Sequence, residues 1–400
     1  MTSSGTANAK QAIEHGGQIE PAGYRMCTRT VMDTTDPDIV FDEHGVSNHW
    51  HEYQEIARTQ LLPPERARDE LTRIVATVQR WGKNNKYDCV LGLSGGVDSS
   101  YLAHLAVESG LRPLLVHFDN GWNTELAVNN IERLVNGLGL DLFTFVMDWP
   151  EFRDLQRSYF MASVLDLDVP TDHMIFGALY KIARSRGLKV ILSGANIVTE
   201  AILPRRWYYP KFDMANLRDI HRRYGSLPLR KLPAMGLAQM IYYGAVYGIT
   251  QVKLLDLVPY QKQAAKRLLT EKYGWRDYGG KHYESIFTRF YQGYILPRKF
   301  NIDKRKAHLS NLICSGQQTR SEAIEELERP TYEPQLQKED KTYVAKKLGF
   351  TDDEFEHLLT LPNRSHSEFA TDARWRKRYF SLMRGVKPIT SRLNRFRRRM

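Results

Sequence analysis

A loop rich in glycine and serine lies between an apolar run at residues 89–93 and a helical pattern at residues 98–110. Glycines let the backbone approach a ligand closely, and the free N–H groups at the start of a helix attract anions. Serine hydroxyls add further donors. The loop therefore predicts a phosphate-binding site, with a ligand-free turn as the alternative. Its residues are Ser94, Gly95, Gly96, Val97, Asp98, Ser99 and Ser100. The pattern is neither a Walker A loop nor the dinucleotide G-x-G-x-x-G.

The elements around this loop alternate between strand and helix. Strand-like apolar runs occupy residues 89–93, 114–118, 142–146 and 190–192, and helical patterns occupy residues 98–110, 124–138 and 172–187. This rhythm predicts an α/β fold with a doubly wound parallel sheet, whose ligands bind at the carboxyl ends of the strands. Residues 39–41 are a short strand candidate, and a helix is expected after Pro63-Pro64. Two capping boxes, Thr319 with Glu322 and Thr351 with Glu354, predict helix starts in a helical C-terminal region.

Composition shifts divide the chain into four parts. We expect an N-terminal segment at residues 1–62, the sheet domain at 63–225, a helical substrate or partner region at 226–370 and a basic tail at 371–400. Residues 232–252 contain no charged side chain, but tyrosines, glycines and glutamines dilute their apolar character. This composition indicates a buried or partner-facing helical segment rather than a membrane span.

The run S-G-G-V-D-S between a strand and a helix resembles the PP-loop of the ATP pyrophosphatases. That superfamily includes NAD synthetase, GMP synthetase, asparagine synthetase and tRNA-thiolating enzymes. The resemblance implies an adenine nucleotide alpha hydrolase-like fold that cleaves ATP to AMP and pyrophosphate while adenylating an oxygen that then leaves. It implies Mg²⁺ at Asp98 and Glu200, although Glu200 also suits a helix N-terminus. The implied ATP contacts are Ser94, Gly95, Gly96, Asp98, Ser99, Ser100, Gly194 and Asp119, the last of which is equally suited to a turn.

Further blocks of sequence are similar to one subfamily, the N-acetyl sugar amidotransferases of bacterial surface-polysaccharide synthesis. These blocks are residues 33–39, 41–46, 273–285, 287–292 and 303–310. The resemblance implies that an acetamido group on a nucleotide-linked sugar becomes an acetamidino group. It also implies ammonia supplied by a glutaminase subunit and a cyclase-like, ammonia-channelling subunit related to histidine biosynthesis.

The second half of the chain offers charged and aromatic side chains for that task. A cationic set with one carboxylate is suited to diphosphate, uronate or a leaving pyrophosphate. The candidate catalytic residues are Lys281, Glu284, Arg289, Lys304 and Arg305, and the candidate substrate residues are Asp172, His173, His282 and His308. The alternative is a charged helix face that packs on the sheet. For Asp172 and His173, which follow Thr171 as the expected N-cap, the alternative is helix capping.

The cysteines favour neither a disulfide framework nor a metal site. Cys27, Cys89 and Cys314 are few and scattered, which indicates a reducing cytoplasm, and no apolar leader follows Met1. Related chains carry two C-x-x-C-like pairs around Cys27, a zinc knuckle, but here Thr30, Ser47 and Trp50 occupy the other positions. We expect no zinc at Cys27, with a residual site using His44, His49 or His51 as the alternative. Because no G-x-C-x-G elbow is present, a partner is expected to supply ammonia, and residues 232–252 are a candidate docking surface.

The net charge of +11 is confined to one end of the chain. Residues 371–400 hold eleven Lys and Arg against one Asp, whereas the remaining residues carry 46 basic and 45 acidic side chains. We expect no nucleic acid partner, because the neutral body offers little charge to follow a phosphate backbone. The tail suits peripheral contact with a membrane, with a solvated terminus as the alternative. Two other functions stay open: a tRNA-modifying enzyme of the thiolation or lysidine type, and a non-catalytic ATP-binding scaffold. Thiolating members of the superfamily generally need a cysteine pair, and none is close in this sequence.

Overall fold

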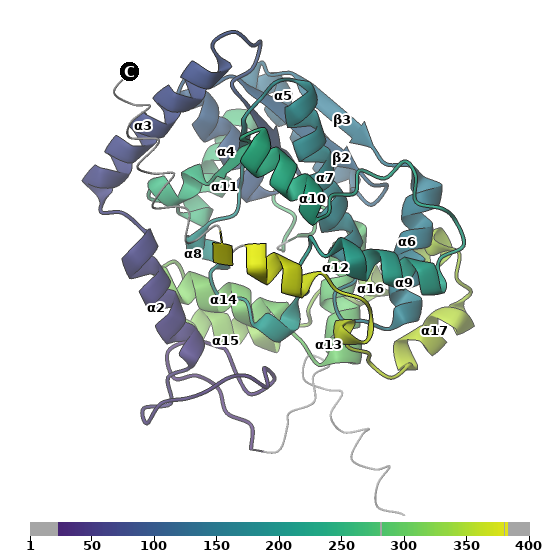
Figure 1. Cartoon of the computed structure of the whole chain (residues 1–400). Helices are drawn as coiled ribbons and strands as arrows, with labels where there is room; N and C mark the ends of the chain where they lie inside the picture. The colour runs from purple at the N-terminus through teal and green to yellow at the C-terminus, as the bar shows by residue number, and fades with distance from the viewer. Residues whose placement is uncertain (1–22, 281, 380, 383–400) are drawn as a thin grey trace, which may run out of the picture.

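A five-stranded parallel sheet has the strand order β3-β2-β1-β4-β5, and its strands β2 and β3 are labelled in the upper part of Figure 1. The computed structural model describes residues 23–280, 282–379 and 381–382. All four strand pairs are parallel, which confirms the predicted fold class. The strands are β1 (Cys89–Gly92), β2 (Pro113–Asp119), β3 (Leu142–Val146), β4 (Val190–Leu192) and β5 (Thr250–Val252).

Helices cover both faces of this sheet because successive strand residues point to opposite sides. Leu91 packs in one apolar cluster with side chains from four helices, and Val90 packs in another with α7 (Val169–Ser185). The four helices on the first face are α3 (Pro64–Gly82), α4 (Val97–Glu108), α5 (Glu125–Leu138) and α11 (Lys262–Tyr273). The beginnings of α4 and α5 therefore lie at the carboxyl edge of the sheet, where ligands bind in this architecture.

A second, aromatic core joins the remaining helices. Phe287, Phe290 and Tyr291 are fully buried there, together with Phe152 of α6 and Phe355 of α17. Both predicted capping boxes are present at the starts of α15 and α17. The helices outside the sheet layer are α2 (Asn48–Gln60), α6 (Trp149–Ala162), α8 (Ile197–Glu200), α9 (Met214–Tyr224), α10 (Leu237–Ile241), α12 (Ile286–Phe290), α13 (Leu296–Phe300), α14 (Lys304–Cys314), α15 (Arg320–Glu328), α16 (Pro334–Leu348) and α17 (Asp352–Thr360).

Three expectations about local structure are wrong. Residues 39–41 form no strand, because Phe41 makes only an isolated bridge to Ser47. Residues 232–252 are not one helix: α10 passes into a π-helical turn (Tyr242–Val246), and the segment ends in β5. An apolar run fits either structure, and pairing with β4 decides for the strand. Thr171 is not an N-cap, because α7 begins earlier, after Asp168. Pro170 explains the early start, since proline suits a first helical turn.

None of the helices in the described part of the chain has the length and apolar character needed to span a bilayer.

Close contact between α7 and the segment before α10 predicts a large effect of one methyl group. A Cβ added at Gly177 would lie 1.6 Å from the carbonyl oxygen of Pro233, whereas a Cβ at Gly244 would meet nothing within 4 Å. We expect Gly177→Ala to lower the free energy of unfolding by about 3 kcal/mol, because two backbones must separate. Gly244→Ala is the matched control and should be neutral or stabilise by up to about 1 kcal/mol. Urea unfolding of both variants tests this, and equal stabilities would contradict the packing.

Candidate active site at the carboxyl edge of the sheet

One pocket is lined by eight of the candidate site residues that the sequence singled out. It lies where the first turn of α4, the loop from β4 to α8, the start of α11 and residues 275–284 meet. Its lining residues are Ser94, Gly96, Val97, Asp98, Ser99, Gly194, Glu200, Lys262, Lys266, Trp275, Asp277, Tyr278, Gly280, His282 and Glu284.

The glycines of the loop are required by its geometry. Gly95 has φ +84°, and its carbonyl oxygen accepts hydrogen bonds from Trp275 Nε1 at 2.8 Å and from the Tyr278 hydroxyl at 3.0 Å. These two donors fix the peptide plane immediately before α4. Gly96 is the N-cap of α4 and offers no side-chain cap, so the N–H groups of the first turn are available to an anion.

Two of the three predicted serine hydroxyls reach the pocket. Ser94 Oγ accepts the N–H of Gly96 at 3.2 Å, and Ser99 Oγ donates to the carbonyl of Gly96 at the same distance. The two hydroxyls are 3.2 Å apart. Ser100 is fully buried and does not line the pocket, so the structure does not bring it to a phosphate.

Four carboxylates line the pocket, and two of them, Asp98 of α4 and Glu200 of α8, are the predicted metal ligands. The hydroxyl of buried Tyr260 donates a hydrogen bond to Asp98 Oδ1. Burial, and then the charge of Asp98, raise the pKa of Tyr260, so that the phenol keeps its proton. Asp256 accepts the N–H of Ile197 at 2.8 Å and fixes the start of α8. Two carboxylates completed by phosphate oxygens are the donor set that Mg²⁺ prefers, so these residues fit the metal.

The pocket also contains cations that sequence reasoning missed. Lys262 Nζ lies 2.9 Å from His308 Nε2, and Lys266 pairs with Asp277 at 2.5 Å. Both lysines lie on α11, four residues apart and therefore on one helical face. The signal was the position of α11 after β5, because a helix that follows a parallel strand begins at the carboxyl edge. The uncharged run at residues 232–252 hides this signal, because such a run fits a helix as well as a strand.

Glu284 reaches the loop because its segment pairs with the turn after β2. The N–H of Thr124 donates to the carbonyl of Glu284 at 3.0 Å, and Ser285 forms a bridge to Asn123. A Cβ at Gly96 would lie 3.2 Å from Glu284 Oε1, so the carboxylate sits directly against the loop. His282 has φ +64°, a costly conformation for a residue with a side chain, and its Nδ1 lies 3.7 Å from Glu284 Oε1. Lys281 lies outside the described residues.

Two predicted catalytic arginines belong to the framework instead. Arg289 Nε and Nη2 each donate to one carboxylate oxygen of Asp340 at 2.8 Å, and the two side chains are only 11% and 6% exposed. Arg305 binds Asp303 at 2.7 Å and donates to the carbonyl groups of Glu326 and Arg329. Neither lines the pocket. Each arginine is kept from the pocket by an ion pair with an aspartate, Asp340 for Arg289 and Asp303 for Arg305. The sequence alone did not assign these partners.

The Arg289–Asp340 pair predicts a stability effect without a catalytic one. We expect Arg289→Met to lower the free energy of unfolding by about 3 to 5 kcal/mol, because it leaves the Asp340 carboxylate buried without its arginine. The double variant Arg289→Met/Asp340→Leu should recover most of the loss. Urea unfolding measures both, and ATP turnover of the folded fraction should stay near that of the wild type. A stable single variant without turnover would contradict this placement.

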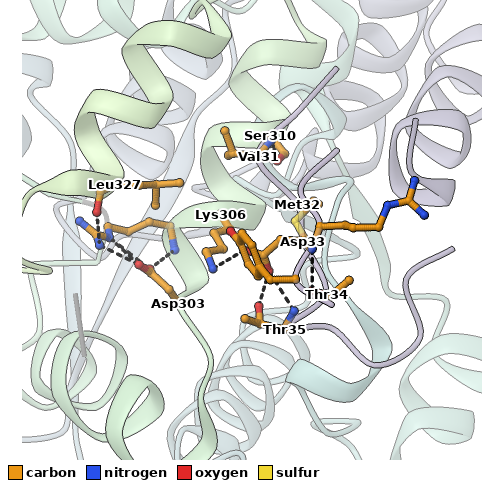
Figure 2. Close-up of polar contacts among 12 residues, drawn as sticks. Val31, Met32, Asp33, Thr34, Thr35, Asp303, Lys306, Ser310 and Leu327 are labelled. Atoms are coloured by element: carbon orange, nitrogen blue, oxygen red, sulfur yellow. Dashed lines mark hydrogen bonds and ion pairs between the residues drawn. The ribbon is translucent and has the colours of Figure 1, made fainter. Parts of the chain in front are cut away.

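Helix α14 is anchored to the N-terminal segment by a buried ion pair. Lys306 pairs with Asp33, whose other contacts are the Tyr24 hydroxyl at 2.8 Å and Thr35 (Figure 2). The N–H of Val31 also donates to Ser310 Oγ at 3.3 Å. Two of the sequence blocks, residues 33–39 and 303–310, thus contact each other. The anchor holds α14 so that His308 reaches Lys262 beside the pocket.

One helical turn before His308, Lys304 approaches a charged cluster in which Asp166 is fully buried and the Asp172 side chain is 41% exposed. We call it the acidic cluster and define it as Asp166, Asp168, Asp172, Lys211 and Lys304. Lys211 Nζ lies 2.7 Å from Asp166 and 3.1 Å from Asp172. Burial and the neighbouring charge of Asp172 raise the pKa of Asp168 to about 6. Burial would lower the pKa of Lys211, but the surrounding aspartates outweigh it and raise that pKa.

His173 and Asp119 make local structural contacts. His173 Nδ1 donates to the carbonyl of Lys211 at 2.7 Å, and its Nε2 accepts the N–H of Met235 at 2.9 Å. Both ring nitrogens are therefore occupied by backbone groups, and burial lowers the pKa of this neutral imidazole. Asp119 accepts the N–H of Gly121 at 2.9 Å, which is a turn contact, and it does not line the pocket.

Two of the positions that the sequence analysis compares with zinc-knuckle cysteines, Thr30 and Ser47, lie against Cys27. Its buried sulfur accepts the N–H groups of Ser47 at 3.2 Å and Arg29 at 3.4 Å. Burial acts to raise the pKa of Cys27, but hydrogen bonds from Ser47 and Thr30 outweigh it, and the net pKa is lowered. The nearby histidines are paired with carboxylates: His49 with Asp36, His51 with Asp42 and His44 with Glu43. Among the described residues no group of three or more potential ligands is arranged to hold a metal ion.

Comparison with known proteins relates this chain to enzymes of several kinds. The tRNA-specific 2-thiouridylase MnmA of Desulfosudis oleivorans is 31% identical over 108 residues, which cover 26% of this chain and 30% of that relative. The chain thus spans less than a third of the length of this curated relative. NMN synthetase from Francisella tularensis is 14% identical with a TM-score of 0.33, covering 72% of this chain and 98% of that one. NAD⁺ synthetase from Burkholderia pseudomallei is 19% identical with a TM-score of 0.28, covering 56% and 97%.

The family comparison concerns the C-terminal quarter of the chain. Residues 284–383 match the model of the LPS biosynthesis protein WbpG-like, C-terminal domain. The match begins at Glu284 in the pocket and includes α12 and α14, which support the site. Over residues 284–383, this chain is therefore similar to the C-terminal domain of WbpG-like LPS biosynthesis proteins, in agreement with its resemblance to enzymes of bacterial surface-polysaccharide synthesis.

Proposed function

We propose that this protein is an ATP-dependent, AMP-forming amidotransferase that converts the acetamido group of an N-acetylated, nucleotide-linked sugar into an acetamidino group. The observation that carries the proposal is one pocket in which the phosphate loop, two carboxylates and two lysines meet Glu284, the first residue of the WbpG-like domain. The segment that matches the polysaccharide-biosynthesis domain therefore contributes a side chain to the pocket that contains the loop.

The reaction balances as two displacements. The acetamido oxygen attacks the α-phosphorus of ATP, pyrophosphate leaves, and the oxygen becomes part of an adenylated imidate. Ammonia then attacks the imidate carbon, AMP leaves with that oxygen, and the lost proton passes to a base. The net change replaces the carbonyl oxygen by NH. The protein contributes by orienting the reactants and stabilising charge in a partly closed site.

The residues divide between the two displacements. The first-turn N–H groups of α4, with Ser94 and Ser99, bind the phosphates, and Lys262 and Lys266 stabilise the leaving pyrophosphate. Mg²⁺, held by Asp98 and Glu200, supplies charge neutralisation of the phosphates when bound. Glu284, whose carboxylate lies against Gly96 of the loop, accepts the proton released when ammonia attacks, with His282 as its neighbour at 3.7 Å.

The acidic cluster supports an acceptor site beside the nucleotide. Lys304 and His308 lie on one face of α14, one helical turn apart. Lys304 belongs to the acidic cluster, and His308 contacts Lys262 of the pocket. Thr288 of α12, three residues beyond Ser285, places its hydroxyl 3.4 Å from Asp168 Oδ1. Asp172 is the accessible carboxylate of the cluster, with 41% of its side chain exposed, and it suits a sugar hydroxyl, whereas Lys304 suits a diphosphate. The acceptor therefore approaches from the side of α12 and α14.

Ammonia is proposed to come from a partner glutaminase with a cyclase-like channelling subunit, in the cytoplasm where ATP is available. The exposed side of α10 and the π-helical turn supports a docking surface, because neither element contains a buried residue. Tyr242 is 42% and Val246 is 72% exposed there.

One relative favours a second candidate, a tRNA-thiolating enzyme. Sulfur transfer through a cysteine pair is poorly supported by this chain, because Cys89 is buried in β1 and Cys27 is enclosed by hydrogen bonds in the N-terminal segment. Burial raises the pKa of Cys314 to about 12, which keeps that thiol protonated and unreactive.

The test is AMP release by the purified chain with Mg-ATP, ammonium and a panel of nucleotide-linked N-acetyl and di-N-acetyl sugars, followed by mass analysis of the sugar. We expect AMP in equal amount to a product whose mass is lower by the difference between O and NH. AMP formed only with tRNA would replace the proposal by the thiolation or lysidine alternative. ATP binding without AMP, in the presence of glutaminase and all the sugars, would favour the scaffold.

A further inference from the structure

Helix α14 presents one row of polar side chains toward the elements that form the pocket. Lys304, His308 and Asn311 follow one another at spacings of four and three residues, so they lie on one face of the helix. Another face carries Lys306 and Ser310, which bind the N-terminal segment (Figure 2). Helix α14 is therefore fixed on one side, and on another it lies against α8, which is labelled beside it in Figure 1.

Asn311 fixes the chain immediately after α8. Its Oδ1 accepts the N–H of Ile202 at 2.8 Å, and its Nδ2 donates to the carbonyl oxygen of Ile202 at 3.1 Å. Nδ2 also donates to the carbonyl oxygen of Ala307 at 2.8 Å, which fixes the orientation of the amide. Asn311 is 1% exposed, so these hydrogen bonds are shielded from water. Because Glu200 lies only two residues before Ile202, Asn311 also restrains the backbone that carries Glu200 into the pocket.

Gln317, just beyond the end of α14, fixes the start of α11. Its Oε1 accepts the N–H of Lys262, the first residue of α11, at 2.7 Å. The N-cap residue of α11 makes no side-chain cap, so Gln317 supplies that hydrogen bond from a different segment. Its Nε2 donates to Ser315 Oγ at 3.2 Å and lies 3.5 Å from the carbonyl oxygen of Tyr260. Gln317 therefore holds the turn that presents Lys262 to the pocket and the Tyr260 hydroxyl to Asp98.

The two contacts act on the two predicted metal ligands, which are far apart in the sequence. Asn311 restrains the segment of Glu200, and Gln317 restrains the turn whose tyrosine binds Asp98. Partners outside the ligand set orient the ligands of a metal site, and their loss typically weakens metal binding. Both amides lie within residues 284–383, the segment that matches the polysaccharide-biosynthesis domain.

We propose that Asn311 and Gln317 are positioning residues for Mg-ATP, through which α14 sets the relative positions of the Asp98 and Glu200 carboxylates. The inference rests on the ATP site of the proposed function, but not on the identity of the acceptor. It assigns the C-terminal domain a role in nucleotide binding in addition to its side chain in the pocket.

The test is calorimetric titration of the full chain with ATP at a series of Mg²⁺ concentrations, without sugar or ammonium. Gln317→Leu removes the acceptor of the Lys262 N–H, and we expect the Mg²⁺ concentration for half-maximal ATP binding to rise about ten-fold. Gln317→Glu keeps an oxygen at that position, and an acid suits the N-terminus of a helix, so this variant should stay close to the wild type.

Asn311→Asp provides the second arm of the test. It keeps an acceptor for the Ile202 N–H but turns an oxygen toward the carbonyl groups of Ile202 and Ala307, so the end of α8 must move. We expect a rise in the Mg²⁺ requirement of the same order, about ten-fold. Thermal unfolding shows whether each variant is folded. Because Gln317 is only half-buried, Gln317→Leu decides the test if Asn311→Asp fails to fold.

Gln318→Leu is the matched control. This neighbouring glutamine is also half-buried, but its Nε2 donates to Glu326 at 3.3 Å and it does not line the pocket. It should bind ATP with the Mg²⁺ dependence of the wild type. A wild-type Mg²⁺ dependence in folded Gln317→Leu, or an equal shift in Gln318→Leu, would overturn the proposal. A wild-type chain that binds no ATP at any Mg²⁺ concentration would overturn the proposed function as well.

Discussion

Asp98→Asn should lower AMP formation by about 10²- to 10³-fold while the protein stays folded. The substitution keeps the shape of the side chain and an oxygen that can accept the Tyr260 hydrogen bond, but it removes the charge that faces the pocket. Stability should fall by no more than about 1 kcal/mol, because an acid in the first turn of α4 interacts favourably with the helix dipole. Steady-state AMP release and urea unfolding measure the two effects separately.

Asp69→Asn is the matched control for this variant. Asp69 is exposed on α3, away from the pocket, so its substitution should change neither turnover nor stability. Wild-type turnover of Asp98→Asn would exclude Asp98 from the reaction. A loss of turnover accompanied by unfolding would assign the aspartate a structural role instead.

Gly95→Ala should weaken ATP binding by at least about 100-fold, the scale of effect produced by a displacement of about 1 Å in a positioned site. Gly95 has φ +84°, and its Cβ would lie 2.9 Å from the Tyr278 hydroxyl and 3.0 Å from the carbonyl oxygen of Ala127. The backbone carbonyl cannot yield easily, so the loop must move and the hydrogen bonds from Trp275 and Tyr278 must distort. Calorimetric titration with Mg-ATP measures the loss.

The control isolates the cost of the backbone conformation from that of the clash. Gly139 has φ +63° at the end of α5, and a Cβ there would meet nothing within 4 Å. Gly139→Ala should therefore cost about 1 to 2 kcal/mol of stability and leave ATP binding intact. If Gly95→Ala bound ATP as Gly139→Ala does, the loop would not be the phosphate site.

The sheet could be predicted from sequence because its signals are local. Buried parallel strands such as β1 appear as short apolar runs, and Thr319 with Glu322 marks a helix start through contacts between near neighbours. The strand β5 could not be predicted in this way. Residues 250–252 are exposed or half-buried and take their structure from pairing with β4, about 60 residues earlier.

The candidate site could likewise be predicted from sequence only where its residues are near neighbours in the chain. Glycines and serines of the loop function next to one another in sequence, so their pattern alone indicates a phosphate site. Lys262 reaches the pocket because α11 follows β5 in the sheet. The partner of Arg289 lies 51 residues away. Whether a cation faces a pocket or a buried aspartate depends on such distant partners. Charge and residue type alone could therefore not separate Arg289 from Lys262.

The measurement that tests the central claim most directly follows the acetamido oxygen. The sugar acceptor is prepared with ¹⁸O in its acetamido group and incubated with Mg-ATP, ammonium and the purified chain. Adenylation of that oxygen predicts that the released AMP carries the heavy isotope and that pyrophosphate does not. AMP without the label would mean that water or another nucleophile attacks ATP, and it would contradict the proposed amidine-forming reaction.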